Sequence, residues 1–203
     1  MYKPKIKNIY NNQQLPSNKM IARDQQIELL KKYLKSENLI KHSLAVEAIL
    51  IALAKRLNKP QDIWAATGLL HDLDYDFTKT EPHKHATMSA QILKGIFSKE
   101  IINAIKSHNF RHTDKTPETS LDKALIAADT ASGLIIATAL IIPSKKLKDV
   151  QLTTLINKYN DTSFARGCDR KRIDLCEDFG IPRKDFLKIS LQALITIDKN
   201  LGL

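Results

Sequence analysis

The stretch AATGLLHDLDYD, residues 65–76, carries a run of small and apolar residues into the pair His71-Asp72. Both polar side chains therefore follow directly on positions that a helix would bury. An unpaired buried carboxylate is costly, and a metal ion is one partner that removes this cost. Asp129 stands in a similar setting, inside the segment LIAADTASG at residues 125–133. The two segments predict a metal site between helices.

Working outward from this stretch, apolar residues recur at helical spacing from Ile21 onward, and strand patterns are nearly absent. The pattern predicts a first helix around Ile27 to Leu34 and a second that begins after Ser36 and ends near residues 58–60. Further helices are expected at about 61–73, 83–96, 98–108, 120–143, 145–158, 169–179 and 183–200. The predicted fold class is all-α, a single-domain helical bundle with extra C-terminal helices.

Three regions are expected along the chain. Residues 1–20 hold four lysines, no acidic residue and no helical apolar period, which is typical of a flexible extension. Residues 21–143 should form the metal-binding helical core, and residues 144–203 should form helices that pack on it. The length of 203 residues suits one globular domain of this kind.

Composition limits the function classes. No stretch reaches the roughly 18 uninterrupted apolar residues of a membrane helix, and the N-terminus lacks a secretory apolar segment, so no membrane partner is expected. Two cysteines are too few for a disulfide framework, which favours the cytoplasm. The net charge of +10 favours anionic partners, without choosing between nucleotides and nucleic acids.

The order of the polar residues resembles the HD superfamily of metal-dependent phosphohydrolases, an all-helical fold with the motif H…HD…D. The first histidine, His42, lies in LIKHSLAVEA, the pair lies in GLLHDLDYD and Asp129 is the final aspartate. Branches that bind two metal ions add two histidines in between, and here His85 opens HATMSAQIL while His108 closes IINAIKSH. The resemblance covers roughly residues 24–140.

The resemblance implies one or two divalent ions, of Fe, Mn, Zn, Ni, Co or Mg, with Asp72 as the bridge between two of them. The implied metal ligands are His42, His71, Asp72, His85, His108 and Asp129. His83 competes with His85 for the same position, and the register with Ala86, Ser89 and Ala90 favours His85. Catalytic roles are expected for Asp72 and for His108 or His112, which could move a proton.

The sequence departs from the family at one position. Many members continue the pair as His-Asp-Ile-Gly-Lys, where the lysine can help to hold phosphate, and Tyr75 stands in its place here. Replacement substrate contacts are Arg111, His83, and Arg166 and Arg170 from the basic segment FARGCDRKRID at residues 164–174, although such clusters are often only solvated. Asp74 and Asp76 either orient ligand histidines or are ordinary turn residues.

These features predict a metal-dependent phosphohydrolase that cleaves a phosphoester or phosphoanhydride bond of a nucleotide or a related small phosphate compound. The alternatives are a nucleic-acid or signalling-nucleotide binding module with a structural metal, and a catalytically inactive HD scaffold. Six matched ligand positions favour the enzyme. Nucleic acid remains a possible but less favoured partner, because basic and aromatic residues do not alternate as they do in single-strand binders.

Overall fold

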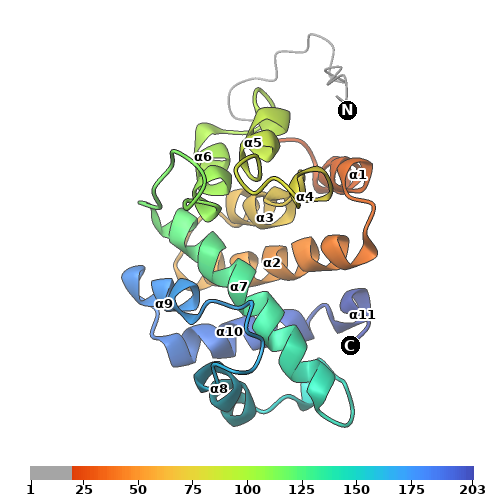
Figure 1. Cartoon of the computed structure of the whole chain (residues 1–203), viewed down its shortest axis with the longest axis vertical. Helices are drawn as coiled ribbons and strands as arrows, with labels where there is room; N and C mark the ends of the chain where they lie inside the picture. The colour runs from red at the N-terminus through yellow and green to blue at the C-terminus, as the bar shows by residue number, and fades with distance from the viewer. Residues whose placement is uncertain (1–19) are drawn as a thin grey trace.

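The computed structural model describes residues 20–203, and the expected extension lies outside this part except for Met20. The described part consists of helices and contains no β-strand, which confirms the predicted all-α fold (Figure 1). The helices are α1 (Arg23–Tyr33), α2 (Glu37–Arg56), α3 (Gln61–Leu70), α4 (Tyr75–Thr78), α5 (Thr87–Leu93), α6 (Lys99–His108), α7 (Ser120–Ile141), η1 (Leu147–Asp149), α8 (Leu152–Asn160), α9 (Arg170–Asp178), α10 (Arg183–Ile195) and α11 (Asp198–Leu201).

Side-chain caps fix the start of the helices that carry the site. Helix α7 begins with a capping box, in which the Thr119 hydroxyl accepts from the backbone N–H of Asp122 and the Asp122 carboxylate accepts from the N–H of Thr119. The Ser98 hydroxyl accepts from the backbone N–H of Ile101 at the start of α6. Both devices satisfy N–H groups that would otherwise lack partners.

The end of one helix and the start of another differ from the prediction, and these differences change where four of the polar site residues lie. Helix α3 ends at Leu70, so His71 and Asp72 lie in the turn that follows it. Helix α5 begins at Thr87 and not near His83, because Ala86 has a φ of 69°, outside the helical region. His83 and His85 therefore lie in the turn before α5, and the segment between the helices expected at 61–73 and 83–96 contains the short helix α4.

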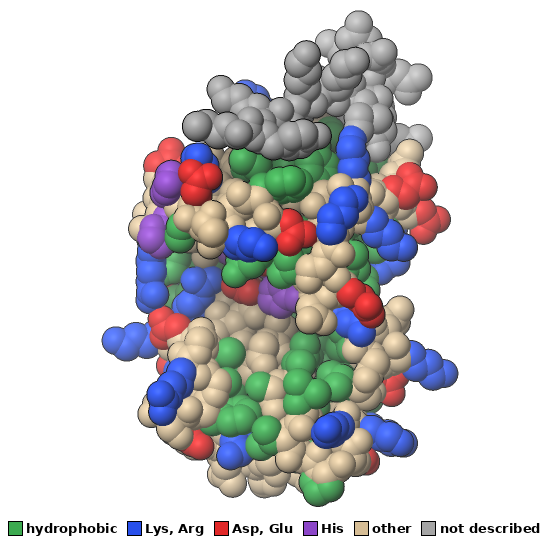
Figure 2. Space-filling model, turned by 45° about the vertical axis from the view of Figure 1, so that its right-hand side comes forward, with side chains coloured by type: hydrophobic (Ala, Val, Ile, Leu, Met, Phe, Trp, Pro, Cys, Tyr) green, Lys and Arg blue, Asp and Glu red, His purple; other side chains and the backbone are tan. Residues whose placement is uncertain are grey.

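The helices bury two apolar clusters. In Figure 1, α5 and α6 lie on one side of α2 and α3, and α8, α9 and α10 lie on the other. One cluster joins residues of α1, α3, α5 and α6. The larger one joins α2 and α7 to α8, α9 and α10 from the C-terminal part. Figure 2 shows a recess across one face of the molecule, with histidine and acidic side chains inside it. The polar site thus lies where the two apolar clusters approach each other.

Helix α7 is long and apolar enough to cross a membrane by length and composition alone. However, 67% of its most apolar window is buried inside the protein. It packs against α2, α6 and α9 and carries Asp129 midway along its length. These features are those of a central core helix, as expected from its sequence.

Candidate metal centre

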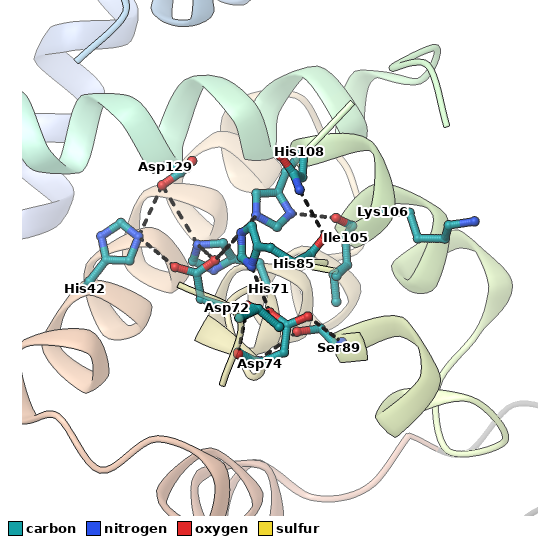
Figure 3. A network of polar contacts seen from close by, with 12 residues as sticks. His42, His71, Asp72, Asp74, His85, Ser89, Ile105, Lys106, His108 and Asp129 are labelled. Atoms are coloured by element: carbon teal, nitrogen blue, oxygen red, sulfur yellow. Dashed lines mark hydrogen bonds and ion pairs between the residues drawn. The ribbon is translucent and has the colours of Figure 1, made fainter. Parts of the chain in front are cut away.

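The six expected metal ligands come from five parts of the chain and face one another (Figure 3). His42 lies in α2, Asp129 in α7, and His108 is the last residue of α6. The other three, His71, Asp72 and His85, occupy the turns after α3 and before α5. The fold therefore gathers side chains that are separated by up to 87 positions in the sequence.

Asp72 is the centre of this group. Its Oδ1 atom lies 3.4 Å from the Nε2 atoms of His71, His85 and His108. Its other oxygen, Oδ2, lies 3.8 Å from Nε2 of His42. One carboxylate thus faces all four histidines, so Asp72 could be shared between two ions if both were bound.

The potential ligand atoms fall into two sets of three that share Asp72. His42, His71 and Asp72 form one set, and Asp72, His85 and His108 form the other, each with its ligand atoms within 4.8 Å of one another. Asp129 extends the first set, because its Oδ1 lies 3.2 Å from Nε2 of His42 and 3.9 Å from Nε2 of His71. The sequence predicted one or two ions, and the division would allow two.

Backbone carbonyls fix the rings of two histidines. Nδ1 of His71 donates to the carbonyl oxygen of Gly68 at 2.8 Å, and Nδ1 of His108 donates to that of Ile105 at 2.5 Å. These contacts hold the proton on Nδ1 and leave the lone pair of Nε2 directed at Asp72. Metal-bound histidines are commonly held in this way.

Side chains fix the other two rings. Nδ1 of His85 donates to Oδ1 of Asp74 at 2.8 Å, and the other oxygen of this buried carboxylate accepts from the backbone N–H of Ser89. Nδ1 of His42 lies 3.2 Å from the Ser132 hydroxyl, which itself donates to the carbonyl of Asp129 and so accepts from the ring. All four histidines thus direct Nε2 toward the carboxylates of the site.

This donor set fits a metal ion. Within residues 20–203, Nε2 of His71 is buried and has no hydrogen-bond partner. The Nε2 atoms of His85 and His108 lie only 2.9 Å apart, although the contacts on their Nδ1 atoms direct a lone pair from each toward the other. A divalent cation would satisfy these acceptors, and imidazole with carboxylate suits zinc, manganese, iron and related ions.

The electrostatics act differently on the individual ligands, because the pKa values of His42 and His85 are raised, against burial, by their contacts with Asp129 and Asp74. Burial lowers the pKa of His71 to about 4, so its ring is neutral at neutral pH. Burial would raise the pKa of Asp72, but the interactions with His71 and His108 outweigh it and hold the pKa well below its usual range. The pKa of Asp129 is likewise lowered, against burial, by the hydrogen bond from His42. Neutral imidazole and ionised carboxylate are the species that ligate divalent ions.

A cavity of about 500 Å³ opens over this group. Its lining includes five of the six candidate ligands, six neighbouring residues from the first part of the chain and four residues from the C-terminal part: Leu39, His42, Asp72, Tyr75, His85, His108, Asn109, Arg111, Asp129, Thr130, Gly133, Gly167, Cys168, Asp169 and Arg172. Tyr75 stands at its edge and meets the His85 ring edge to face, with centroids 5.4 Å apart. The cavity has room for a nucleotide-sized molecule beside the metal ligands.

The structure separates the expected substrate contacts. Arg111 lines the cavity and pairs with Asp169 at 2.7 Å. His83, Arg166 and His112 are exposed and lie outside the lining of this cavity. The guanidinium of Arg170 is also outside the lining and is already occupied by backbone carbonyls, those of Lys158, Tyr159, Asp161, Phe164, Ala165 and Cys168. This geometry argues against a substrate role for Arg170 and gives it the role of ordering the segment before α9.

Three residues gain roles that the sequence left open or did not assign. Asp74 orients His85, whereas Asp76 accepts from the backbone N–H groups of Lys35 and Ser36 and so holds the start of α2. Arg172, which belongs to the basic segment noted in the sequence, reaches Asp129 at 3.0 Å. Both aspartates were candidates for orienting a histidine because they lie close to the motif, and the structure gives this role to Asp74.

Comparisons with known proteins agree with this geometry. Residues 39–134 match the profile of the HD domain. The chain is 35% identical over 99 residues to Ribonuclease Y of Nitratidesulfovibrio vulgaris (strain DP4), and 31% identical over 98 residues to Ribonuclease Y of Aster yellows witches'-broom phytoplasma (strain AYWB). Each match covers 48% of this chain but only 18% of the relative. The comparison with solved structures gave no match.

The matched region, residues 39–134, contains all six candidate ligands and the five chain segments that present them. The shared motif, the helical fold and the converging donor atoms thus have the same explanation. Residues 39–134 of this chain carry an HD domain, and its His and Asp side chains are compatible with a metal site of the HD type.

Proposed function

We propose that this protein is a phosphohydrolase that cleaves a phosphoester or phosphoanhydride bond of a nucleotide or a related small phosphate compound. The observation that carries the proposal is the position of one Asp72 oxygen, 3.4 Å from three histidine Nε2 atoms. A carboxylate surrounded by acceptor nitrogens has no use in a purely structural core, where these groups would need donors.

The ions would be held by His42, His71, Asp72 and Asp129 on one side and by Asp72, His85 and His108 on the other. Bound divalent ions supply an activated water and stabilise the charge that develops on phosphoryl oxygens. His108 is therefore a ligand in this proposal, and the role of Asp72 in catalysis is to hold both ions. His112, which is exposed and outside the cavity lining, would not take part in proton transfer.

Arg111 is the residue that we assign to the substrate phosphate. It reaches the cavity from the loop after α6, and its partner Asp169 comes from the N-terminus of α9. A phosphate group could replace the Asp169 carboxylate as the acceptor, since a guanidinium binds both kinds of oxygen in the same planar geometry. Arg111 would then take the place of the family lysine that Tyr75 replaces here.

The first experiment measures metal content and hydrolysis together. Purified protein is analysed for bound metals and then assayed on nucleotides and generic phosphodiesters with added Mn²⁺, Fe²⁺, Co²⁺, Ni²⁺, Mg²⁺ or Zn²⁺. Asp72→Asn should lose both metal and turnover. Asp62→Asn is the matched control, because Asp62 is exposed at the start of α3, and it should retain both. Substantial turnover by Asp72→Asn would refute the proposed mechanism.

A second experiment tests the substrate contact. Arg111→Gln should raise KM by about 10-fold or more while metal binding persists, because a charge-assisted hydrogen bond to phosphate is lost. Arg166→Gln removes the same charge from an exposed position outside the cavity lining and should leave KM unchanged. Equal KM values for the two variants would remove Arg111 from the site.

RNA is the second candidate substrate, and the similarity to Ribonuclease Y and the net charge of +10 favour it. A chain of phosphates would bind beyond the cavity, so affinity should fall steeply with salt as counterions are released. A labelled oligoribonucleotide and a mononucleotide, assayed side by side from about 50 to 200 mM salt, distinguish the two. Faster cleavage of the oligonucleotide with a steep salt dependence would favour RNA.

We also retain the cytoplasm as the expected location. The free thiols are Cys168, which is half-buried, and Cys176, which is buried. Burial raises the pKa of the Cys176 thiol to about 12, so this thiol is protected from oxidation as well as from pairing. Free cysteines without disulfides are the usual state in a reducing compartment.

A further inference from the structure

Arg172 connects α9, a helix of the C-terminal part, to the candidate metal centre. Its Nη2 atom lies 3.0 Å from Oδ2 of Asp129 and 3.0 Å from the carbonyl oxygen of His108, and its Nε lies 3.1 Å from the Thr130 hydroxyl. The side chain is mostly buried, with 19% exposed, and it lines the cavity. One guanidinium therefore contacts two of the segments that carry candidate ligands.

The contact with Asp129 determines which of its oxygens is available. Oδ2 accepts from Arg172, whereas Oδ1 faces His42 at 3.2 Å and His71 at 3.9 Å. A carboxylate held in this way offers a single oxygen to an ion. Without the guanidinium, both oxygens would be free and the carboxylate could rotate or bind an ion through both.

The contact with His108 acts on the backbone. His108 ends α6, and the last carbonyls of a helix lack partners within the helix. Arg172 satisfies this carbonyl at a position where the side chain must point Nε2 at Asp72. The same residue thus supports one ligand from each of the two sets.

We propose that Arg172 is a positioning residue of the metal centre, supplied from outside the HD domain match at residues 39–134. It holds Asp129 so that only Oδ1 is available to an ion, and it fixes the carbonyl at the end of α6. Helix α9 therefore supplies a residue that supports the ligands. The inference rests on the proposed function, since it concerns the ions that this function requires. It assigns a role in the site to the helices that follow the HD domain.

Lysine could not replace Arg172. A guanidinium presents its N–H groups in a fixed planar fork, and here they serve three acceptors at once. A lysine ammonium has a compact charge on a flexible chain and would satisfy one or two of them. Removal of the positive charge would by itself favour a cation, so geometry and charge predict opposite changes in metal affinity.

The test uses the full chain, with Co²⁺ as the probe for both affinity and coordination. Arg172→Gln should weaken Co²⁺ binding by about 10- to 100-fold, the usual range for residues that orient metal ligands, and should alter the visible absorption spectrum of bound Co²⁺. Lys171→Gln is the matched control, since it removes the same charge from an exposed position of α9. Its affinity and spectrum should equal those of the wild type.

Arg172→Lys keeps the positive charge and serves as a second variant in case Arg172→Gln does not fold. Circular dichroism of the metal-free protein shows whether each variant is folded. Arg172→Lys should also change the Co²⁺ spectrum. Wild-type spectra and affinities in both variants, or tighter binding by Arg172→Gln, would overturn the positioning role. If the wild type itself bound no divalent ion, the proposed function would fail, and that outcome is distinct from variants that bind like the wild type.

Discussion

Asp74 and Asp76 lie two positions apart in the segment after His71 and Asp72, yet their carboxylates bind different parts of the protein. Asp74 is fully buried and binds the His85 ring, the backbone of Ser89 and, more weakly, Thr78. Asp76 faces the start of α2 and binds backbone N–H groups there. The pair allows a comparison at the level of single residues, because the same substitution removes the same charge.

Asp74→Asn should weaken metal binding by about 10- to 100-fold. The amide oxygen can still accept from His85, but the neutral group no longer holds the proton on Nδ1 as strongly, so Nε2 becomes a poorer ligand. Titration of the metal-free protein with Zn²⁺ against a competing chelator measures this loss. Affinity equal to that of the wild type would show that Asp74 does not orient His85.

Asp76→Asn provides the control for this comparison. It should leave metal affinity unchanged and lower the free energy of unfolding by about 1 kcal/mol, since the N-terminus of α2 loses a charged acceptor. Urea denaturation measures the second effect. A large loss of metal affinity here would mean that the whole segment, and not the Asp74 contact, supports the site.

At the level of elements, the packing of α3 on α2 depends on a glycine. A Cβ atom at Gly68 would lie 2.8 Å from the backbone nitrogen of Glu47 and 2.9 Å from the carbonyl carbon of Val46. These are backbone atoms that cannot move aside. The carbonyl of the same glycine fixes the ring of His71 in the turn after α3.

Gly68→Ala should therefore lower the free energy of unfolding by about 1–3 kcal/mol, as expected for overpacking in a core. Gly133→Ala in α7 is the matched control, because its Cβ would lie 3.4 Å from the Cys168 sulfur, which is ordinary contact. A helical alanine gains up to about 1 kcal/mol over glycine, so this variant should be neutral or more stable. Urea denaturation of both variants decides; equal stability would contradict the packing argument.

The sequence predicted the presence of the helices better than the residues at which they begin and end. Helical spacing and the HD motif were enough to place α2, α6 and α7 and to bring six ligands together, because the motif residues lie on or beside strongly periodic segments. The predicted start of α5 was wrong because Ala86 has a positive φ, and an alanine in the sequence gives no sign of this conformation. Arg170 and Arg172 are alternate members of one basic segment, and only the fold shows which faces carbonyls and which faces Asp129.

For the whole molecule, the question is whether the C-terminal helices and the HD domain form one unit. Residues of α8, α9 and α10 share an apolar cluster with α2 and α7, and this cluster also includes Trp64 of α3. Phe186 of α10 is fully buried in it. The predicted division at residue 143 therefore separates segments that bury a common surface, and a single cooperative transition is expected.

Phe186→Ala tests this directly, because Trp64 is the only tryptophan and reports on the HD domain. The variant should lose about 3–5 kcal/mol of stability through the cavity that it leaves. The unfolding midpoint from tryptophan fluorescence should fall together with that from circular dichroism. Phe77→Ala removes a ring that is 43% exposed, and it should change both midpoints little. If the fluorescence midpoint of Phe186→Ala stayed at the wild-type value, the C-terminal helices would be a separate unit, and Arg172 would contact the metal centre across a domain boundary.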